Sequence, residues 1–269
     1  MMIIELKNIT KCFPVYIEDM PRNEPAQAAS LQEADPLRLR DGLFYALEDV
    51  SLSINSGECA IIAGANGSGK SLLMSIIAGL EEPSSGTVKT ACKAGLVFQE
   101  PDAQILGETP GEDIAFGPRN MKLSKSEIRA RVDAALAETG LTERADFPAR
   151  SLSGGEKRRL AAAGVLAMSA QIIIFDEPYA NMDYPGVVQI NRLFQKLISD
   201  GKTVVILTHE LEKCLALADR FIVLCNGKKV FDGSAAEALS EELAADLESW
   251  GIHHPLHNAA ANLENLLWV

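Results

Sequence analysis

The stretch from Gly64 to Ser71 reads Gly-Ala-Asn-Gly-Ser-Gly-Lys-Ser, and it has the residue types and spacing needed to hold a phosphate group. Its glycines let successive backbone N–H groups turn inward around an anion. Lys70 can reach the β- and γ-phosphates of a nucleotide, and the Ser71 hydroxyl can take a place on Mg²⁺. The stretch therefore predicts a nucleotide site. Its candidate binding residues are Gly64, Ala65, Asn66, Gly67, Ser68, Gly69, Lys70, Ser71 and Leu72.

The residues on either side of this loop predict the elements that position it. The apolar run from Ala60 to Ala63 is typical of a buried strand, and the apolar residues from Leu72 to Ala78 are typical of a helix. A strand, a glycine-rich loop and a helix in this order form the context in which such a loop binds phosphate. The amino end of the helix adds roughly half a positive charge to the site.

A pair of acidic residues, Asp176 and Glu177, follows a second apolar run, Ile172–Phe175. This run shows no polar alternation, as expected of a parallel strand that is covered on both faces. Ligands bind at the carboxyl ends of the strands in an open parallel sheet, so the pair is expected beside the phosphate loop. There Asp176 can hold Mg²⁺ through water, and Glu177 can orient or deprotonate an attacking water.

Two more strands are expected to end in a polar side chain at the same edge. His209 follows the apolar run Thr203–Leu207, and Gln99 closes the run Ala94–Phe98. A histidine at this edge is expected to contact the γ-phosphate of the nucleotide. With Lys70 and the acidic pair, these side chains form one constellation at four strand ends.

A second anion-binding segment, Leu152-Ser-Gly-Gly-Glu156, precedes a helix that is expected to run through Met168. Its candidate nucleotide-binding residues are Ser153, Gly154, Gly155 and Glu156. The segment places a hydroxyl and a glycine pair at a helix amino end, which attracts anions. We expect it to lie too far from the phosphate loop to share one nucleotide within a chain. Two copies arranged head to tail could instead clamp ATP between the phosphate loop of one and this segment of the other.

The composition is that of an ordinary globular protein. The chain has 269 residues, of which 47% are hydrophobic and 23% charged, which allows one large domain with a smaller appended one. A formal net charge of −12 argues against nucleic acid as a partner, because proteins that bind it usually carry a basic surface. We find no signal-peptide layout and no apolar run of the roughly 20 residues that a membrane span needs. The five cysteines form no C-x-x-C pair and are expected to be buried free thiols in a reducing cytosol.

The rest of the chain predicts short elements separated by loops. Strands are expected over residues 3–9 and 50–54. Residues 14–43 contain four prolines and are expected to form an exposed insertion, and residues 99–120 contain three and are expected to be loop-like. The further expected elements are helices over 124–140, 186–199 and 210–218, a hairpin over 221–230 with its turn at Asn226-Gly227, a capped helix from Ser234, and a helical leucine stripe over 258–269.

With these motifs in this order, the chain resembles the ATP-binding subunits of ABC transporters from residue 3 to about residue 235. The resemblance implies a family role for each motif: Walker A for Gly64–Ser71, the Q-loop glutamine for Gln99, the signature motif for Leu152–Glu156, Walker B for Ile172–Asp176, the catalytic glutamate for Glu177 and the switch histidine for His209. The implied catalytic residues are Glu177, His209, Lys70 and Gln99, and the implied metal ligands are Ser71, Gln99 and Asp176.

Two details of the family pattern stay open. Phe13 stands where the family has the aromatic residue that stacks on adenine, but Tyr16, Phe44 and Tyr45 compete for that role because the expected insertion follows Phe13. Residues 180–184 read Ala-Asn-Met-Asp-Tyr, where the D-loop of the family more often reads Ala-Gly-Leu-Asp-Pro. The aspartate of this segment, Asp183, is retained, which implies communication across a dimer.

Further segments resemble the energy-coupling factor (ECF) branch of the family, whose ATPases drive uptake of vitamins and of cobalt or nickel. These segments are Phe98–Ile105, Glu112–Pro118 and Arg158–Met168. In that branch the Pro-Asp-x-Gln segment, Pro101 to Gln104 here, contacts helices of the membrane T component.

The resemblance implies an α/β fold of the P-loop NTPase class: an ABC-type domain with a mixed, mainly parallel core sheet, an antiparallel β subdomain and a helical subdomain. It implies an ATPase domain over residues 1–235, with the helical subdomain over about 99–168, and a C-terminal helical extension over 236–269. It further implies ATP and Mg²⁺ as cofactors, and a homodimer or a heterodimer with a paralogous ATPase. The dimer would work with a transmembrane T component and a substrate-binding S component at the cytoplasmic face of the membrane.

An ATPase subunit of another type of ABC transporter is the alternative. The ABC ATPases of chromosome maintenance and DNA repair insert long coiled coils between Walker A and the signature motif, where this chain has only residues 72–151. A translation-associated ABC protein would carry two cassettes, whereas this chain has one phosphate loop. The transported substrate leaves no record here, because specificity in such systems lies in the membrane subunits.

Overall fold

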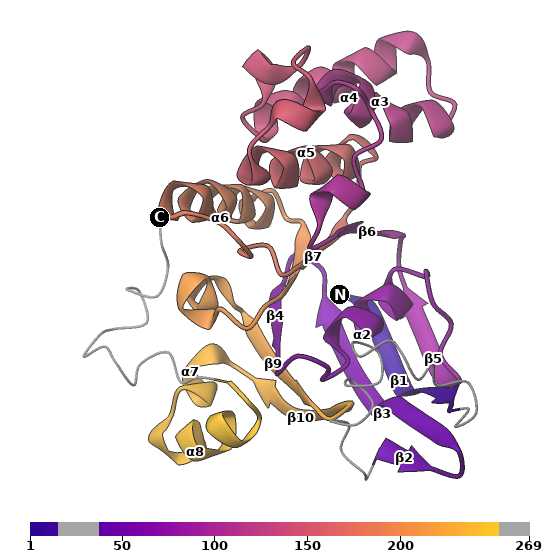
Figure 1. Cartoon of the computed structure of the whole chain (residues 1–269), viewed down its shortest axis with the longest axis vertical. Coiled ribbons are helices and arrows are strands. Elements are labelled where there is room, and N and C mark those ends of the chain that lie inside the picture. Colours follow the sequence, from indigo (N-terminus) through magenta and orange to yellow (C-terminus); the bar gives the residue numbers. More distant parts are fainter. Residues whose placement is uncertain (16–37, 253–269) are drawn as a thin grey trace, which may run out of the picture.

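The computed structural model describes residues 1–15 and 38–252, which form two β-sheets with helices around them (Figure 1). One sheet is antiparallel and has the strand order β2-β3-β1-β5. Its strands are β1 (Met2–Pro14), β2 (Leu39–Arg40), β3 (Leu43–Asn55) and β5 (Ser85–Thr90). Strands β1 and β3 contain the expected strands 3–9 and 50–54, but both are longer, because their pairing continues as far as Pro14 opposite Leu43.

That pairing brings the two ends of the expected insertion, residues 14–43, next to each other. The last part of this segment belongs to the sheet, since β2 pairs with the start of β3. The greater part, residues 16–37, lies outside the described residues.

The second sheet is the core of the molecule. It has six strands in the order β10-β9-β4-β8-β7-β6, in which β10 pairs antiparallel with β9 and every other neighbouring pair is parallel. The strands are β4 (Cys59–Ala63), β6 (Ala94–Val97), β7 (Ile172–Asp176), β8 (Thr203–Leu207), β9 (Arg220–Cys225) and β10 (Lys228–Gly233). Residues Ile172–Phe175 of β7 are buried, as is every residue of β4 and β8, which confirms the prediction of parallel strands covered on both faces.

Helices cover both faces of the core sheet. Helix α2 (Lys70–Ile77) packs between the two sheets, with Leu73 and Met74 in the apolar cluster that they share. Helix α6 (Tyr184–Ser199) covers the opposite face, where Phe194 lies in a second cluster. The five cysteines are free thiols, as expected, but only Cys59 and Cys214 are fully buried, and burial raises the pKa of Cys59 to about 12.

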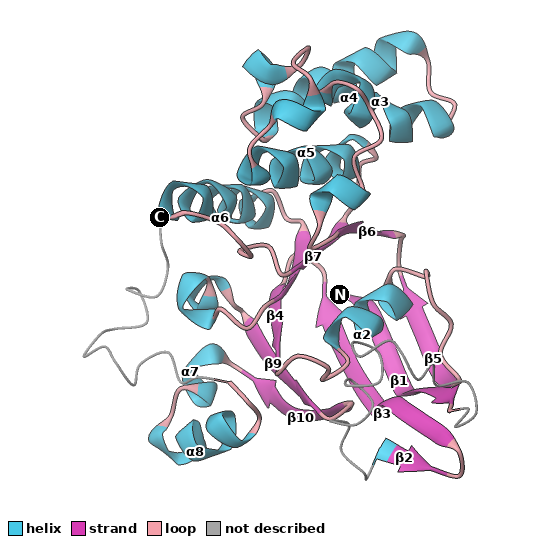
Figure 2. Cartoon of the chain, viewed as in Figure 1, coloured by secondary structure: helices cyan, strands magenta, loops and turns pink. Residues whose placement is uncertain are grey.

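Three helices gather at one end of the molecule, beyond the edge strand β6 (Figure 2). They are α3 (Pro110–Asn120), α4 (Lys125–Glu138) and α5 (Gly154–Ala167), and they pack around a third apolar cluster. The prediction of a loop over 99–120 is therefore wrong for its second half. Pro110 stands in the first turn of α3, where its missing N–H costs nothing, and Thr109 caps the helix. Short 3₁₀ turns lie before α3, at Pro101–Ala103, and between α4 and α5, at Thr142–Arg144 and Ala149–Ser151.

The predicted helix starts agree with the structure at all three capping boxes in the described part of the chain, of which the one at Ser234 begins α7. Ser124 with Glu127 caps α4, and Ser153 with Glu156 caps α5. The expected helix over 210–218 is instead two 3₁₀ turns, Leu211–Lys213 and Leu215–Leu217. The backbone of Cys214, with φ −148° and ψ −6°, is not helical and separates them.

The described chain ends in two helices beside the core sheet. The hairpin of β9 and β10 turns at Asn226-Gly227, both with positive φ, as predicted. Helix α7 (Ala235–Ala238) begins at the predicted cap and is followed by α8 (Glu241–Ser249). Leu247 and Ile252 are buried in the core cluster, whereas the expected leucine stripe over 258–269 lies outside the described residues. No helix in the described part of the chain is long and apolar enough to cross a membrane.

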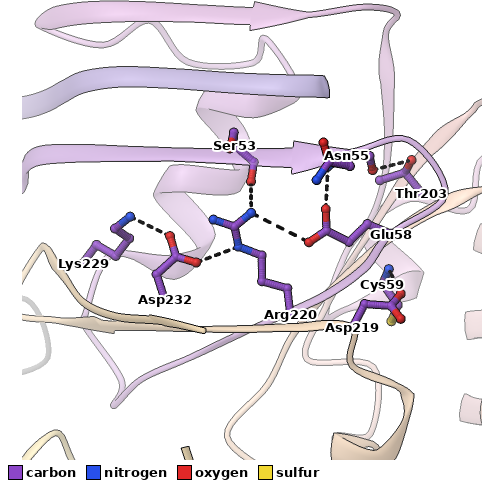
Figure 3. Close-up of polar contacts among 9 residues, drawn as sticks. All are labelled: Ser53, Asn55, Glu58, Cys59, Thr203, Asp219, Arg220, Lys229 and Asp232. Carbon is purple, nitrogen blue, oxygen red and sulfur yellow. Dashed lines mark hydrogen bonds and ion pairs between the residues drawn. The ribbon is translucent and has the colours of Figure 1, made fainter. Parts of the chain in front are cut away.

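An arginine on β9 ties the two sheets together (Figure 3). The Arg220 guanidinium donates to the carbonyl oxygen of Ser53 on β3 (2.6 Å) and to the carboxylate of Asp232 on β10 (2.6 Å). Glu58 lies 3.8 Å from the same guanidinium and accepts from the Asn55 N–H at 2.6 Å. This network joins the carboxyl end of β3 to the hairpin of the core sheet.

Candidate nucleotide-binding site

The phosphate loop runs from the end of β4 into α2 and is enclosed by backbone on two sides. At Gly64 an added Cβ would stand 2.1 Å from the carbonyl oxygen of Leu224, and at Gly69 it would stand 2.9 Å from that of Ala46. Gly69 also has φ +101°, which only glycine adopts without strain. Gly64 and Gly69 are therefore required by the close approach of β9 and β3 to the loop, whereas an added Cβ at Gly67 would meet nothing within 4 Å.

Lys70 is buried at the base of the loop. Its Nζ donates to the carbonyl oxygens of Gly64 (2.6 Å) and Ala65 (3.1 Å). Burial lowers the pKa of Lys70, while the negative charges of Glu177 and Asp176 oppose that shift. A buried ammonium is costly to keep charged, and an incoming phosphate would offset this cost. The residue therefore fits the expected phosphate contact.

Ser71 and Asp176 meet as the sequence predicts, with 3.2 Å between Ser71 Oγ and Asp176 Oδ1. Burial raises the pKa of Asp176, and the hydrogen bond from Ser71 and the charge of Lys70 only partly offset this effect. A hydroxyl beside a carboxylate is a set of oxygen donors that suits Mg²⁺. The pair fits the metal ion that the sequence predicts.

Glu177 and His209 form the second pair at this edge, with 3.0 Å between His209 Nδ1 and Glu177 Oε1. The Glu177 side chain is nearly buried, whereas that of His209 is more than half exposed. Glu177 has φ +43°, an unusual value for a non-glycine residue, and its N–H donates to the carbonyl oxygen of Leu207 (2.9 Å). Backbone strain of this kind concentrates at functional sites. The carboxylate is thus held at a fixed position between the ends of β7 and β8.

Two of the predicted site residues, Gln99 and Phe13, contact neither the Ser71–Asp176 pair nor the Glu177–His209 pair in the described contacts. Gln99 follows β6 with an exposed side chain, and its carbonyl oxygen accepts a hydrogen bond from Arg158 (2.9 Å). Phe13 is exposed on β1 opposite Phe44, and Lys11 Nζ lies 5.2 Å from the centre of its ring. Tyr16 lies outside the described residues, so the choice among the candidate aromatics stays a prediction.

Ser153 begins α5, where its Oγ accepts from the N–H of Glu156 (3.3 Å) and its own N–H donates to the Glu156 carboxylate (2.8 Å). Residues 153–156 line a surface pocket of about 490 Å³ together with Asn181 and Asp183. No residue of the phosphate loop lines this pocket. The two anion-binding segments of one chain therefore face different spaces, which agrees with the expectation that they do not share a nucleotide within a chain.

Two contacts on the loop were missed by sequence reasoning. The Arg38 guanidinium donates to the carbonyl oxygen of Gly67 (2.9 Å). Near the end of the described chain, Gly251 approaches Ala65 so closely that an added Cβ would stand 2.9 Å from the Cβ of Ala65. Arg38 lies in a proline-rich segment and Gly251 follows α8, and neither segment carries a motif that points to the loop.

Comparison with known proteins agrees with this geometry. Residues 47–180 match the family model of the ABC transporter. The chain is 39% identical to the cobalt import ATP-binding protein CbiO of Rhodobacter capsulatus, covering 78% of this chain and 80% of that protein. It is 38% identical to the energy-coupling factor transporter ATP-binding protein EcfA of Carboxydothermus hydrogenoformans, covering 78% and 82%.

Solved structures show the same fold. CbiO1 of Clostridium perfringens, part of the ABC transporter complex cbiONQ, has a TM-score of 0.73 at 30% identity and covers 92% of this chain and 95% of its own. The ATP-binding cassette MJ0796, a dimer in a post-hydrolysis state with ADP and Pi, has a TM-score of 0.69 at 29% identity, covering 86% and 98%.

The fold and the paired side chains define an ATP-hydrolysing cassette of the P-loop class, as predicted. The chain belongs to the ABC transporter family, as an ATP-binding subunit. Within that family it is similar to the ATP-binding subunits of ECF and cobalt import systems.

Proposed function

We propose that the chain powers an ECF-type importer of a vitamin or a transition-metal ion from the cytoplasmic face of the membrane. The observation that carries this proposal is an apolar surface groove between α3 and α5, next to the Pro-Asp-x-Gln segment. The groove has a volume of about 350 Å³ and is lined by Leu106, Phe116, Met121, Met168 and neighbouring residues. We call it the α3–α5 groove. All four of these large apolar side chains are exposed, and such a patch marks a site of interaction.

The proposed occupant of the α3–α5 groove is a helix of the membrane T component, through which the S component joins the complex. Gln104 lines the groove and also holds the end of β6. Its Nε2 donates to the carbonyl oxygen of Leu96 (2.9 Å), and its Oε1 accepts from the N–H of Phe98 (3.1 Å). A helix that presses on Gln104 would therefore act on the strand that leads to Gln99. This contact offers a physical route from the membrane partner to the ATP site.

Nucleotide is proposed to bind at the interface of a dimer, formed by two copies or by this chain and a paralogous ATPase. Each ATP would lie between Lys70 of one subunit and Ser153 of the other, with Mg²⁺ on Ser71, Asp176 and Gln99. Two features support this arrangement: the pocket at residues 153–156, which no phosphate-loop residue lines, and the dimeric state of the related cassette MJ0796. Glu177 would accept the proton of the attacking water.

Replacement of both Phe116 and Met121 by glutamine tests the proposed partner. Both side chains are exposed, so the isolated subunit should fold and hydrolyse ATP as before. Expressed with its native operon and a tag, the wild-type chain should co-purify in detergent with a T component that mass spectrometry identifies. The double variant should lose that component.

A matched control is Leu80→Gln, because Leu80 is also an exposed large apolar residue but follows α2 and does not line the groove. It should retain the membrane component. Normal co-purification by the Phe116/Met121 double variant would remove the α3–α5 groove as the docking site. A membrane partner of another transporter type would favour the alternative, an ATPase subunit of another kind of ABC transporter.

A further inference from the structure

Arg38 joins the start of β3 to the phosphate loop through its guanidinium group. The side chain is buried and donates to three carbonyl oxygens. Nε donates to Tyr45 (3.0 Å) and Nη2 to Ala46 (2.8 Å), both on β3. Nη1 donates to Gly67 (2.9 Å) in the loop. A buried charge that is taken out of water needs such partners, so the arginine and the three carbonyls hold one another in place.

The geometry suits arginine and no other cation. The planar guanidinium offers several N–H donors in a rigid fork, whereas a lysine offers one flexible ammonium. The guanidinium also lies 4.6 Å from the ring centre of Phe44, so its plane is held from a further side. At Gly227, in the β9–β10 turn, an added Cβ would stand 3.3 Å from Nη2. Arg38 is therefore packed between the hairpin, β3 and the loop.

The carbonyl that Arg38 holds belongs to a turn of the loop. The N–H of Ser68 donates to the carbonyl oxygen of Ala65 (3.1 Å), and Gly67 lies within this turn at φ +76°. Glycine has no side chain to restrict its rotation, so the peptide unit after Gly67 can turn more freely than others. Phosphate binding by a loop of this kind depends on the directions of its backbone N–H groups. The N–H of the peptide unit after Gly67 is that of Ser68 and is already used within the turn, so the hydrogen bond from Arg38 fixes the turn from which the following N–H groups extend.

We propose that Arg38 is a positioning residue of the ATP site, which holds the turn from Ala65 to Ser68 so that the backbone N–H groups after it face the phosphate. It acts through the loop and does not contact the reacting atoms. A loop fixed before binding loses less freedom when the nucleotide arrives, and the gain appears as affinity. Once ATP is bound, the water and Glu177 are unaffected. The loss of Arg38 should therefore change the KM for ATP more than kcat.

Arg38→Met tests whether the KM for ATP changes more than kcat, because methionine keeps much of the side-chain length and removes every donor. Its KM for ATP should rise about tenfold, which corresponds to about 1.4 kcal/mol. The kcat at saturating ATP should stay within about twofold of wild type. The Kd for ADP should rise in parallel with the KM, because ADP also carries the phosphates that the loop holds. Arg38→Lys keeps the charge and one donor, and its KM should lie between those of wild type and Arg38→Met.

Arg40→Met is the matched control. Arg40 lies two residues further along, pairs with Glu48 (2.7 Å) and stacks on Tyr45, but its described contacts do not reach the loop. It should leave the KM unchanged. An unchanged KM for Arg38→Met, a lower kcat at unchanged KM, or an equal rise in KM for Arg40→Met would each overturn the proposal. If Arg38→Met does not fold, Arg38→Lys decides alone, and a wild-type KM for that variant overturns the proposal.

Discussion

His209 Nδ1 lies 3.0 Å from Glu177 Oε1, so a histidine two residues past the end of β8 holds the carboxylate that directly follows the neighbouring strand β7. The register of the sheet explains this contact, because Asp176 on β7 pairs with Leu207 on β8. Glu177 and His209 follow these two positions closely along the chain. A nearly buried carboxylate with one oxygen held by a histidine can present the other oxygen to a water molecule.

Glu177→Gln should lower ATP turnover by a factor of about 10² to 10⁴, the usual contribution of a general base. Glutamine has almost the same shape, but it cannot take a proton from water. Nucleotide affinity should persist, because Lys70, Ser71 and Asp176 are unchanged. Steady-state hydrolysis and equilibrium binding of ATP measure the two effects separately. Hydrolysis at a near wild-type rate would assign activation of the water to another residue.

Ser153→Arg should prevent the ATP-dependent dimer that the Glu177→Gln protein is expected to accumulate. Arginine at this position would fill the pocket beside Asn181 and Asp183 that is proposed to receive the nucleotide of the partner. Size-exclusion chromatography with and without ATP measures the dimer.

The control for this variant is Ser124→Arg, since Ser124 caps α4 with the same capping box. Both substitutions remove a helix cap, at a cost of about 1 kcal/mol. Only the one on α5 should abolish the dimer. A dimer that survives Ser153→Arg would contradict the head-to-tail arrangement.

Arg220→Met should reduce the free energy of unfolding by about 2–3 kcal/mol, because it removes charge-assisted hydrogen bonds and leaves the Asp232 carboxylate without its arginine. Urea unfolding at neutral pH measures this loss. Lys229→Met is the matched control, because Lys229 also donates to Asp232 (2.6 Å) but lies on the same strand. It should cost less, since no link between the sheets is lost. Equal losses would show that the tie between the sheets contributes nothing of its own.

The ion pair between Arg220 and Asp232 also makes the free energy of unfolding depend on pH. Burial raises the pKa of Asp232, but hydrogen bonds from Arg220 and Lys229 outweigh this effect and hold the pKa below its usual value. A lowered pKa in the folded state adds stability above the unfolded pKa of about 4, and this stability is lost as the pH falls through the lower folded pKa. The difference in stability between wild type and Arg220→Met should therefore be largest at neutral pH and shrink in acid. A difference that stays constant down to about pH 3 would contradict the assignment.

The position of Arg38 determines how much of the expected insertion can be replaced without loss of ATP affinity. Replacement of residues 17–36 by a short Gly/Ser linker should leave the KM for ATP within about twofold, because shortening a loop changes its closure entropy by only about a kcal/mol. Replacement of residues 17–42 also removes Arg38 and β2, and it should raise the KM as much as Arg38→Met does. ATPase assays of both variants make the comparison. A rise in KM with the shorter replacement would place a nucleotide contact within residues 17–36.

The sequence was most informative where a residue's role depends on its place at the end of a strand. The apolar runs before Glu177 and His209 predicted parallel strands, and parallel strands bring their carboxyl ends to one edge, so both pairs at the site could be anticipated. Helix α3 was missed because a proline is as common in a loop as in the first turn of a helix, so Pro110 does not distinguish the two. Arg38 could not be found, because its partners are backbone carbonyls of β3 and the loop, and no side-chain pattern records them.

The contact between Ala65 and Gly251 restricts how this protein can diverge. The phosphate-loop pattern leaves position 65 open to any residue, yet here the backbone at Gly251 stands so close that an added Cβ would come within 2.9 Å of the Ala65 side chain. A larger residue at either position would collide with the other, and Gly251 is held further by its φ of +75°. During evolution, a substitution of Ala65 by a larger residue would therefore be tolerated only after the segment that follows α8 has moved away from the loop. Two positions at opposite ends of the domain would then evolve as a linked pair.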